Sequence, residues 1–265
     1  MIKNLVAERK LIWTLARNDF KTKFAGSYLG IVWALVQPVV TVLVYWFVFQ
    51  VGLKQTDTSA YNGYPFILWM LAGLVPWFYF QEAMTGGTNV LMEYSYLVKK
   101  VVFKIEILPV VKAVSALFIH TFFVCVAVIL YSCYGKFPGV YGLQIIYYSF
   151  CMFMLVTGIC YATSAVAVFF RDLLQIVNIF LQVGVWATPI MWDLQSIGLP
   201  GILVKIFKLN PMYYVVYGYR DALIHKVWFW ERPGLTLYFW GFTVLMFLIG
   251  TKIFKRLRVH FADVL

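Results

Sequence analysis

The sequence predicts an all-α polytopic membrane protein with six transmembrane helices, an N-terminal amphipathic interface helix and two re-entrant outer helices between spans five and six. Three observations predict it. Hydrophobic residues make up 63% of the chain and charged residues only 12%, which excludes an ordinary soluble domain. Long stretches carry no charge, and lysines and arginines cluster beside some of them, as the positive-inside rule requires.

Residues 1–24 are predicted to form an amphipathic helix in the cytoplasmic interface. Apolar residues of this segment can share one helical face, while its basic residues point mostly away. The residues expected to mark the interface helix are Arg9, Lys10, Trp13 and Arg17. The alternative is a solvated basic leader that docks nowhere.

Residues 25–265 are predicted to form one six-span transmembrane domain. Six charge-free stretches are long enough, as helices of about 20 residues, to cross about 30 Å of hydrocarbon. They cover residues 24–53, 58–81, 113–135, 137–170, 173–192 and 233–251.

The segment 193–232 is apolar, but charged residues interrupt it. Its uncharged pieces are too short to span a bilayer, so they fit re-entrant or interfacial helices.

The basic residues predict the orientation. Fifteen lysines and arginines fall on the side of the two termini and seven on the other, which predicts that both termini are cytoplasmic. The net charge of +11 is therefore assigned to topology and to anionic lipid headgroups, and we expect no binding of nucleic acid.

Several kinds of catalytic and binding motif are absent from the sequence. It contains no G-x-x-x-x-G-K-[ST] phosphate loop and no G-x-S-x-G nucleophile elbow. The three histidines are scattered without partners at ligand spacing, so neither a metal site nor a catalytic site is predicted. Glu82, Lys112 and His120 are the only ionisable candidates at the spans, and all three lie near span boundaries where they can reach water. These are too few for an ion-coupled carrier. Because the chain has neither an ATP-binding motif nor a set of ion-coupling residues, the energy for any transport would have to come from another subunit. The chain is therefore expected to be a non-enzymatic subunit without cofactors, and ATP and magnesium would bind to that partner subunit.

Three motifs in the second half of the chain carry a family resemblance. They are Phe170-Arg171-Asp172-Leu173-Leu174-Gln175, Thr188-Pro189-Ile190-Met191-Trp192 and Leu209-Asn210-Pro211-Met212-Tyr213-Tyr214. Two further motifs, Gln37-Pro38 and Leu71-Ala72-Gly73, lie upstream. With these five motifs the chain resembles type 2 ABC exporter permeases, and among them the polysaccharide and teichoic acid export branch.

The resemblance implies a homodimer that binds two copies of a separate ATPase subunit. The loop 89–106 mixes tyrosines and lysines with apolar residues, which suits a short helix seated in a groove of that partner. The alternative is a basic stop-transfer loop that faces headgroups. A turn at 171–172 would add a smaller contact, or only an ion pair within the chain. The predicted coupling residues are Met92, Glu93, Tyr94, Tyr96, Lys99, Lys100, Arg171 and Asp172.

The family also places two half-spanning helices before the last span, on the outer side, which corresponds here to residues 197–208 and 212–226. We interpret this segment as an outer gate. Its marker residues are Pro189, Asn210, Pro211 and Arg220.

The expected cargo is a lipid-linked polymer of the bacterial cell envelope, exported across the cytoplasmic membrane. Teichoic acid is the first expectation because the basic N-terminal arm and cytoplasmic loop could attract a phosphate-bearing head, such as that of a teichoic acid or a diphosphate-linked glycan. The positive-inside rule explains the same charges equally well. O-antigen or another polysaccharide, and a drug or small lipid, are the alternatives. Aromatic rings could stack on sugars along the path, although rings also belt both interfaces of any polytopic protein. The candidate rings are Trp33, Tyr45, Trp46, Trp69, Trp77, Tyr79 and Trp186.

Two other classes of protein compete with an exporter subunit. A secondary transporter would carry an ionisable group at the membrane midplane, and no convincing one is found in the sequence. A membrane scaffold would not explain the charged outer segment.

Overall fold

The computed structural model describes residues 5, 7–23, 28, 30, 32–52, 61–99, 104–194, 198 and 200–264. All regular elements of this part of the chain are helical. The long helices are α3 (Val32–Trp46, continued by η1, Phe47–Gly52), α4 (Phe66–Glu93), α6 (Leu108–Cys133), α7 (Gln144–Phe169) and α11 (Pro233–Leu257). The shorter helices are α2 (Arg9–Lys23), α5 (Ser95–Val98), α8 (Leu173–Ala187), α9 (Gly201–Lys208), α10 (Pro211–Arg220) and α12 (Phe261–Val264). Further short turns are η3 (Ile105–Ile107), η4 (Gly139–Leu143), η5 (Asp221–His225), η6 (Phe229–Glu231) and η7 (Arg258–His260).

Five helical segments are long and apolar enough to cross a membrane: Val32–Gly52, Phe66–Glu93, Ile105–Cys133, Gly139–Phe169 and Pro233–His260. These fit an all-α polytopic membrane protein, as predicted. The expected fifth span, 173–192, is shorter than predicted, because α8 ends at Ala187. Thr188 precedes a proline and is extended, since the ring of Pro189 disfavours a helical conformation before it. The 15 residues of α8 reach only about 22 Å.

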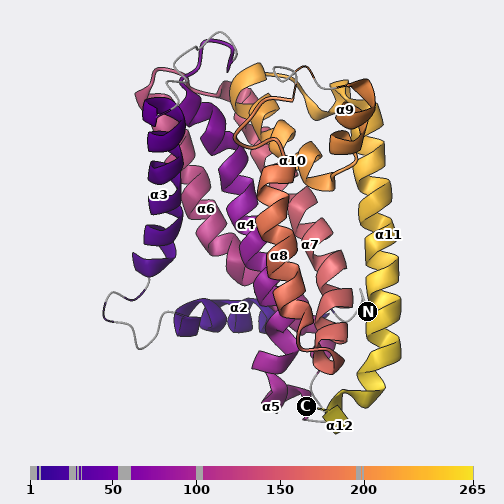
Figure 1. Cartoon of the computed structure of the whole chain (residues 1–265). Helices are drawn as coiled ribbons and strands as arrows, with labels where there is room; N and C mark the ends of the chain where they lie inside the picture. The colour runs from indigo at the N-terminus through magenta and orange to yellow at the C-terminus, as the bar shows by residue number, and fades with distance from the viewer. Residues whose placement is uncertain are drawn as a thin grey trace.

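Helices α3, α6, α7, α8 and α10 pack on α4, whereas α11 packs mainly on α7. Of the most apolar 18 residues of each span, 72% are buried in α4 and 0% in the first span. Figure 1 shows α4, α6, α7 and α8 together in the bundle, with α3 and α11 on opposite sides. The backbones of α7 and α11 approach closely at Gly158 and Gly250, where a Cβ on Gly250 would lie 2.2 Å from the Gly158 carbonyl oxygen. Small residues allow such contacts between membrane helices.

Helix α2 lies across the lower end of the bundle, roughly perpendicular to the long helices (Figure 1). Ile12 and Ala16 are buried against the bundle, and Leu15 packs beside them. Arg9, Lys10 and Arg17 are exposed. The predicted helix and its apolar face are therefore present, and its place in a membrane interface stays a prediction.

Helices α9 and α10 lie at the other end of the molecule from α2 (Figure 1). Helix α9 lies within the predicted outer piece 197–208, of which residues 197 and 199 fall outside the described chain. Helix α10 begins at Pro211, one residue before the predicted piece 212–226. The Asn210 side chain accepts a hydrogen bond from Met212 N at 3.0 Å, and Pro211 occupies the first turn of α10. An N-cap followed by proline is a common start for a helix.

Candidate transport groove and coupling face

A groove of about 740 Å³ lies between α3, α4, α6 and α8. We call it the aromatic groove. It is lined by Lys23, Trp33, Ala34, Gln37, Pro38, Thr41, Tyr45, Leu74, Val75, Trp77, Phe78, Tyr79, Gln81, Glu82, Thr85, Ala116, Ile119, His120, Phe123, Asn178, Leu181, Gln182, Val185 and Trp186.

Five of the seven predicted path aromatics meet in this groove: Trp33, Tyr45, Trp77, Tyr79 and Trp186. Tyr45 of α3 and Trp186 of α8 lie edge to face at 6.3 Å between ring centroids. Trp33 and Trp186 are each 51% exposed, whereas Trp77 and Tyr79 are buried in the wall of the groove.

The other two candidate rings lie elsewhere. Trp46 packs against the hydrophobic core, and Trp69 is 3% exposed beneath the guanidinium of Arg220. Neither lines the aromatic groove.

The groove also contains a group of uncharged polar side chains that the sequence reasoning missed. The amides are Gln37, Gln81, Asn178 and Gln182. Asn178 Oδ1 accepts a hydrogen bond from Thr85 Oγ1 at 3.1 Å, which joins α8 to α4. His120 is buried and lines the groove, with Nε2 2.8 Å from the hydroxyl of Tyr219. Amides isolated in apolar spans were the sequence signal that could have found this set.

Glu82 and Lys23 form an ion pair at the end of the groove nearest α2. Both residues also line a smaller cavity of about 270 Å³, together with Asp19, Glu93 and Lys112. The aromatic groove therefore continues toward α2 through shared walls.

Asp19 connects α2 to the bundle at that cavity. Its carboxylate accepts hydrogen bonds from Lys112 Nζ at 2.6 Å and from the Tyr94 hydroxyl at 2.7 Å. Lys112 also pairs with Glu93 at 2.8 Å. Asp19 is only 4% exposed. We call these four residues the Asp19 junction.

Burial, followed by the hydrogen bond to Asp19, raises the pKa of the Tyr94 phenol above its ordinary value. The phenol therefore stays a donor at neutral pH. Because Tyr94 directly follows α4 and precedes α5, the Asp19 junction fixes the predicted coupling loop to α2.

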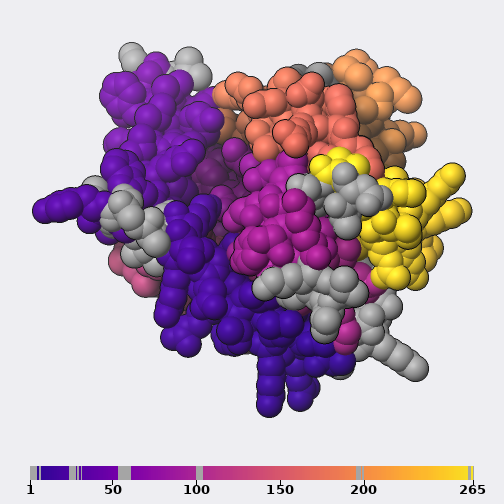
Figure 2. Space-filling view, turned by 90° about the horizontal axis from the view of Figure 1, so that it is seen from below, coloured from indigo at the N-terminus to yellow at the C-terminus, as the bar shows by residue number. Residues whose placement is uncertain are grey.

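The other predicted coupling residues lie at the same end of the molecule. Tyr96 and Lys99 are exposed on and just after α5, and Met92 lies in the last turn of α4. Lys100 falls outside the described residues. Arg171 and Asp172 are exposed in the turn before α8. Figure 2 shows α2 in indigo, the segment around α5 in magenta and the end of α11 in yellow on one face, which we call the coupling face.

The predicted outer-gate residues meet at the opposite end, around the turn that follows α8. Asn210 Nδ2 donates to Thr188 Oγ1 at 2.8 Å, and Arg220 Nη2 donates to the Ile190 carbonyl at 2.8 Å. Pro189 lies between Thr188 and Ile190 in the sequence, and it is buried. The outer segment is therefore tied to the end of α8 at two points.

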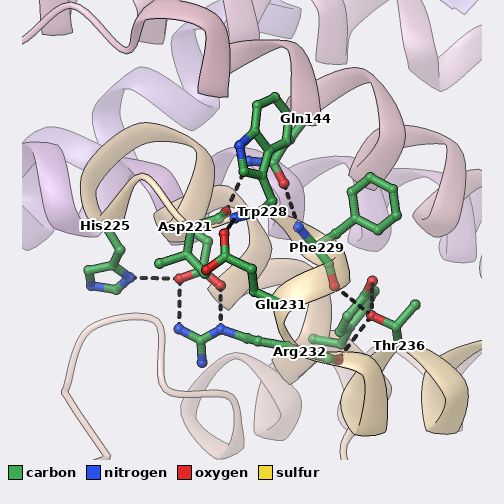
Figure 3. A network of polar contacts seen from close by, with 10 residues as sticks. Gln144, Asp221, His225, Trp228, Phe229, Glu231, Arg232 and Thr236 are labelled. Carbon is green, nitrogen blue, oxygen red and sulfur yellow. Dashed lines mark hydrogen bonds and ion pairs between the residues drawn. The ribbon is translucent and has the colours of Figure 1, made fainter.

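A polar network connects the outer segment to the start of α11 (Figure 3). The Asp221 carboxylate pairs with Arg232 Nε at 2.9 Å and lies 2.9 Å from His225 Nδ1. Gln144 of α7 accepts from Phe229 N at 2.8 Å and donates to the Val227 carbonyl at 3.0 Å. The chain between α10 and α11 is thus held to α7.

The family described as ABC-2 type transporter matches residues 10–224 of this chain. This chain belongs to the ABC-2 type transporter family. The predicted resemblance to type 2 ABC exporter permeases is confirmed, and the chain is a multi-pass membrane transporter subunit. Members of this family work with an ATPase partner subunit.

Curated relatives of this ABC-2 transporter match along nearly its whole length. An O-antigen export system permease protein RfbA from Myxococcus xanthus is 26% identical, covering 99% of this chain and 98% of the relative. Two proteins of the same name from Klebsiella pneumoniae are 24% and 25% identical, and each match covers 96% of this chain and 95% of the relative.

Proposed function

We propose that this chain is the membrane-spanning subunit of an ATP-driven exporter of a lipid-linked cell-surface polysaccharide of the O-antigen kind. The relatives support the polysaccharide alternative better than teichoic acid, since all three are named for O-antigen export. The observation that carries the proposal is the aromatic groove, which combines exposed rings with amides.

The groove suits a sugar polymer better than a metal ion or a small cation. Indole and phenol rings stack on sugar faces, and each ring also offers a polar group at its edge. The amides of Gln37 and Gln182 can donate and accept hydrogen bonds with hydroxyl groups. A lining without a dominant charge permits the chain of sugars to step along it without being held at one point.

The proposed assembly is a homodimer with two ATPase subunits. The exposed apolar residues of α3 and α8 border the groove, and a second copy facing them would enclose the path. ATP binding on the partner would move the coupling face, and the Asp19 junction would pass that motion to α2 and α4.

The proposed function is tested by reconstituting the chain with its cognate ATPase subunit in proteoliposomes and measuring ATP-dependent export. Three cargoes are compared: a lipid-linked polysaccharide, a lipid-linked teichoic acid and a lipophilic dye. We expect export of the polysaccharide. Export of only teichoic acid or only the dye would identify the cargo as one of the alternatives and contradict the proposal.

Replacing Trp186 with leucine is expected to slow polysaccharide export about two- to twelvefold, because ring contacts contribute about 0.5–1.5 kcal/mol. The control is Phe180→Leu on the same helix, 73% exposed and outside the groove. ATPase binding should be unchanged in both. Equal export by the two variants would mean that Trp186 lies off the path.

The double variant Tyr96→Ala/Lys99→Ala is expected to lose most of the co-purifying ATPase subunit, because both side chains are exposed on the coupling face and contribute apolar contact and charge to a partner groove. Tyr94 is left intact because it belongs to the Asp19 junction. The matched control, Lys208→Ala/Leu209→Ala, removes an exposed basic and an exposed apolar residue at the opposite end. Loss of the ATPase subunit in the control alone would mean that the subunit binds at the opposite end of the molecule and not on the coupling face.

A further inference from the structure

A second groove, of about 700 Å³, lies between α2, α3 and α6. We call it the apolar groove. Its walls on α3 and α6 are hydrocarbon: Leu35, Phe118 and Phe122 line it beside Ala34 and Ile119. The last two also line the aromatic groove, so the two grooves lie on opposite sides of one helix seam.

Helix α2 contributes one stripe of side chains to the apolar groove. Trp13, Arg17 and Lys21 follow one another at intervals of four residues and therefore share a face. All three line the groove and are exposed. The neighbouring stripe, which includes Ala16 and Asp19, is buried against the bundle.

The tryptophan is held by an aromatic contact with the wall. The ring of Trp13 packs edge to face on the ring of Phe118, with 5.3 Å between their centroids. The ring centroid of Phe20 lies 5.5 Å from that of Phe118. The guanidinium of Arg17 and the ammonium of Lys21 therefore project from a helix that closes one side of an apolar trough.

The chemistry of this groove is one-sided. Among the described residues that line it, two are cations and none is an acid. The Trp13 indole is the sole uncharged side chain there with a hydrogen-bonding group, in contrast to the amides of the aromatic groove. The apolar groove thus offers hydrocarbon contact and positive charge, and it lacks the amides that could bind sugar hydroxyls in the aromatic groove.

We propose that the apolar groove binds one anionic phospholipid of the surrounding bilayer. Its phosphate lies between Arg17 and Lys21, and an acyl chain lies against Leu35, Phe118 and Phe122. The lipid thereby tethers α2, which carries Asp19, to α3 and α6. This inference does not depend on the identity of the cargo.

The test is native mass spectrometry of the full chain in detergent with equal amounts of phosphatidylglycerol and phosphatidylcholine. We expect one retained phosphatidylglycerol per chain. The double variant Arg17→Gln/Lys21→Gln should weaken its retention about thirtyfold, because two headgroup contacts are lost. The control Arg9→Gln/Lys10→Gln removes the same charge from the same helix outside the groove and should retain the lipid.

A third variant, Ala34→Phe, fills the groove without changing any charge and should also lower retention. Unchanged thermal unfolding would show that each variant is folded. Equal losses in both charge variants would reduce the effect to general attraction between a basic helix and anionic lipid, and would overturn the proposal. So would full retention by Ala34→Phe, or a retained mass that corresponds to lipid-linked polysaccharide.

Discussion

Replacing Asp19 with asparagine is expected to lower the stability of the folded chain by about 3–5 kcal/mol, the usual cost of removing one partner of a buried ion pair. The side chains of Asp19 and Lys112 are only 5% and 12% exposed. The asparagine keeps the shape but leaves Lys112 with Glu93, which is largely exposed. Thermal unfolding in detergent measures the loss.

The same variant is expected to separate ATP hydrolysis from export. The ATPase subunit should still bind, because Tyr96 and Lys99 are unchanged, while α2 is no longer fixed to Tyr94 and Lys112. ATPase and export rates measured in the same proteoliposomes test this. A parallel fall of both rates would mean that the Asp19 junction supports folding only.

Two further variants calibrate the Asp19 result. Asp172→Asn makes the same chemical change at an exposed position in the turn before α8 and should shift stability by less than about 0.5 kcal/mol. Asp19→Asn/Lys112→Met removes the cation that would be left with Glu93 alone and should recover much of the loss. If Asp19→Asn behaved like Asp172→Asn, the junction would have no energetic role.

Local features of the fold could be predicted because their causes are local. The basic and apolar faces of α2 follow from helical periodicity, and the start of α10 follows from Asn210 and Pro211. The sequence Thr188-Pro189 also indicates that α8 ends early, because a proline disfavours a helical conformation of the residue before it. The span over 173–192 was predicted from the length of the charge-free stretch alone, and for that reason it was too long.

Long-range pairs could not be predicted in the same way. Asp19 and Lys112 are separated by 93 residues. The hydrophobic periodicity of each segment predicts a helix but does not indicate which residue of another helix it contacts. A single acid among the basic residues of α2 was the available hint. Likewise the seven candidate rings could be found by type, but whether a ring faces the aromatic groove, as Trp77 does, or lies under a cation, as Trp69 does, depends on packing.

Replacing Arg220 with alanine is expected to lower stability by about 3–5 kcal/mol, as for other large buried side chains. Arg220 is fully buried. Its guanidinium carbon lies 3.4 Å from the centroid of the Trp69 ring, and Nη2 donates to the Ile190 carbonyl at 2.8 Å. Alanine leaves a cavity, an uncovered ring and a buried carbonyl without its donor.

Arg220→Met and Arg220→Lys separate the volume of this side chain from its charge. Methionine fills most of the space without a buried cation, so it should recover more than half of the stability lost in alanine. Lysine keeps the charge but cannot stack a planar group on Trp69, so it should fall between alanine and the wild type. Thermal unfolding of the three variants measures these stabilities, and the alanine variant is expected to be the least stable.

The order of the three variants also decides how the outer gate is held. Within the described chain Nε and Nη1 of Arg220 make no hydrogen bond, so the cation is under-paired for its burial. If methionine is stable but export falls, the ring contact and the Ile190 bond act in gating. If methionine is as unstable as alanine, the bond to Ile190 holds the end of α8 in place, and α10 can move only together with it.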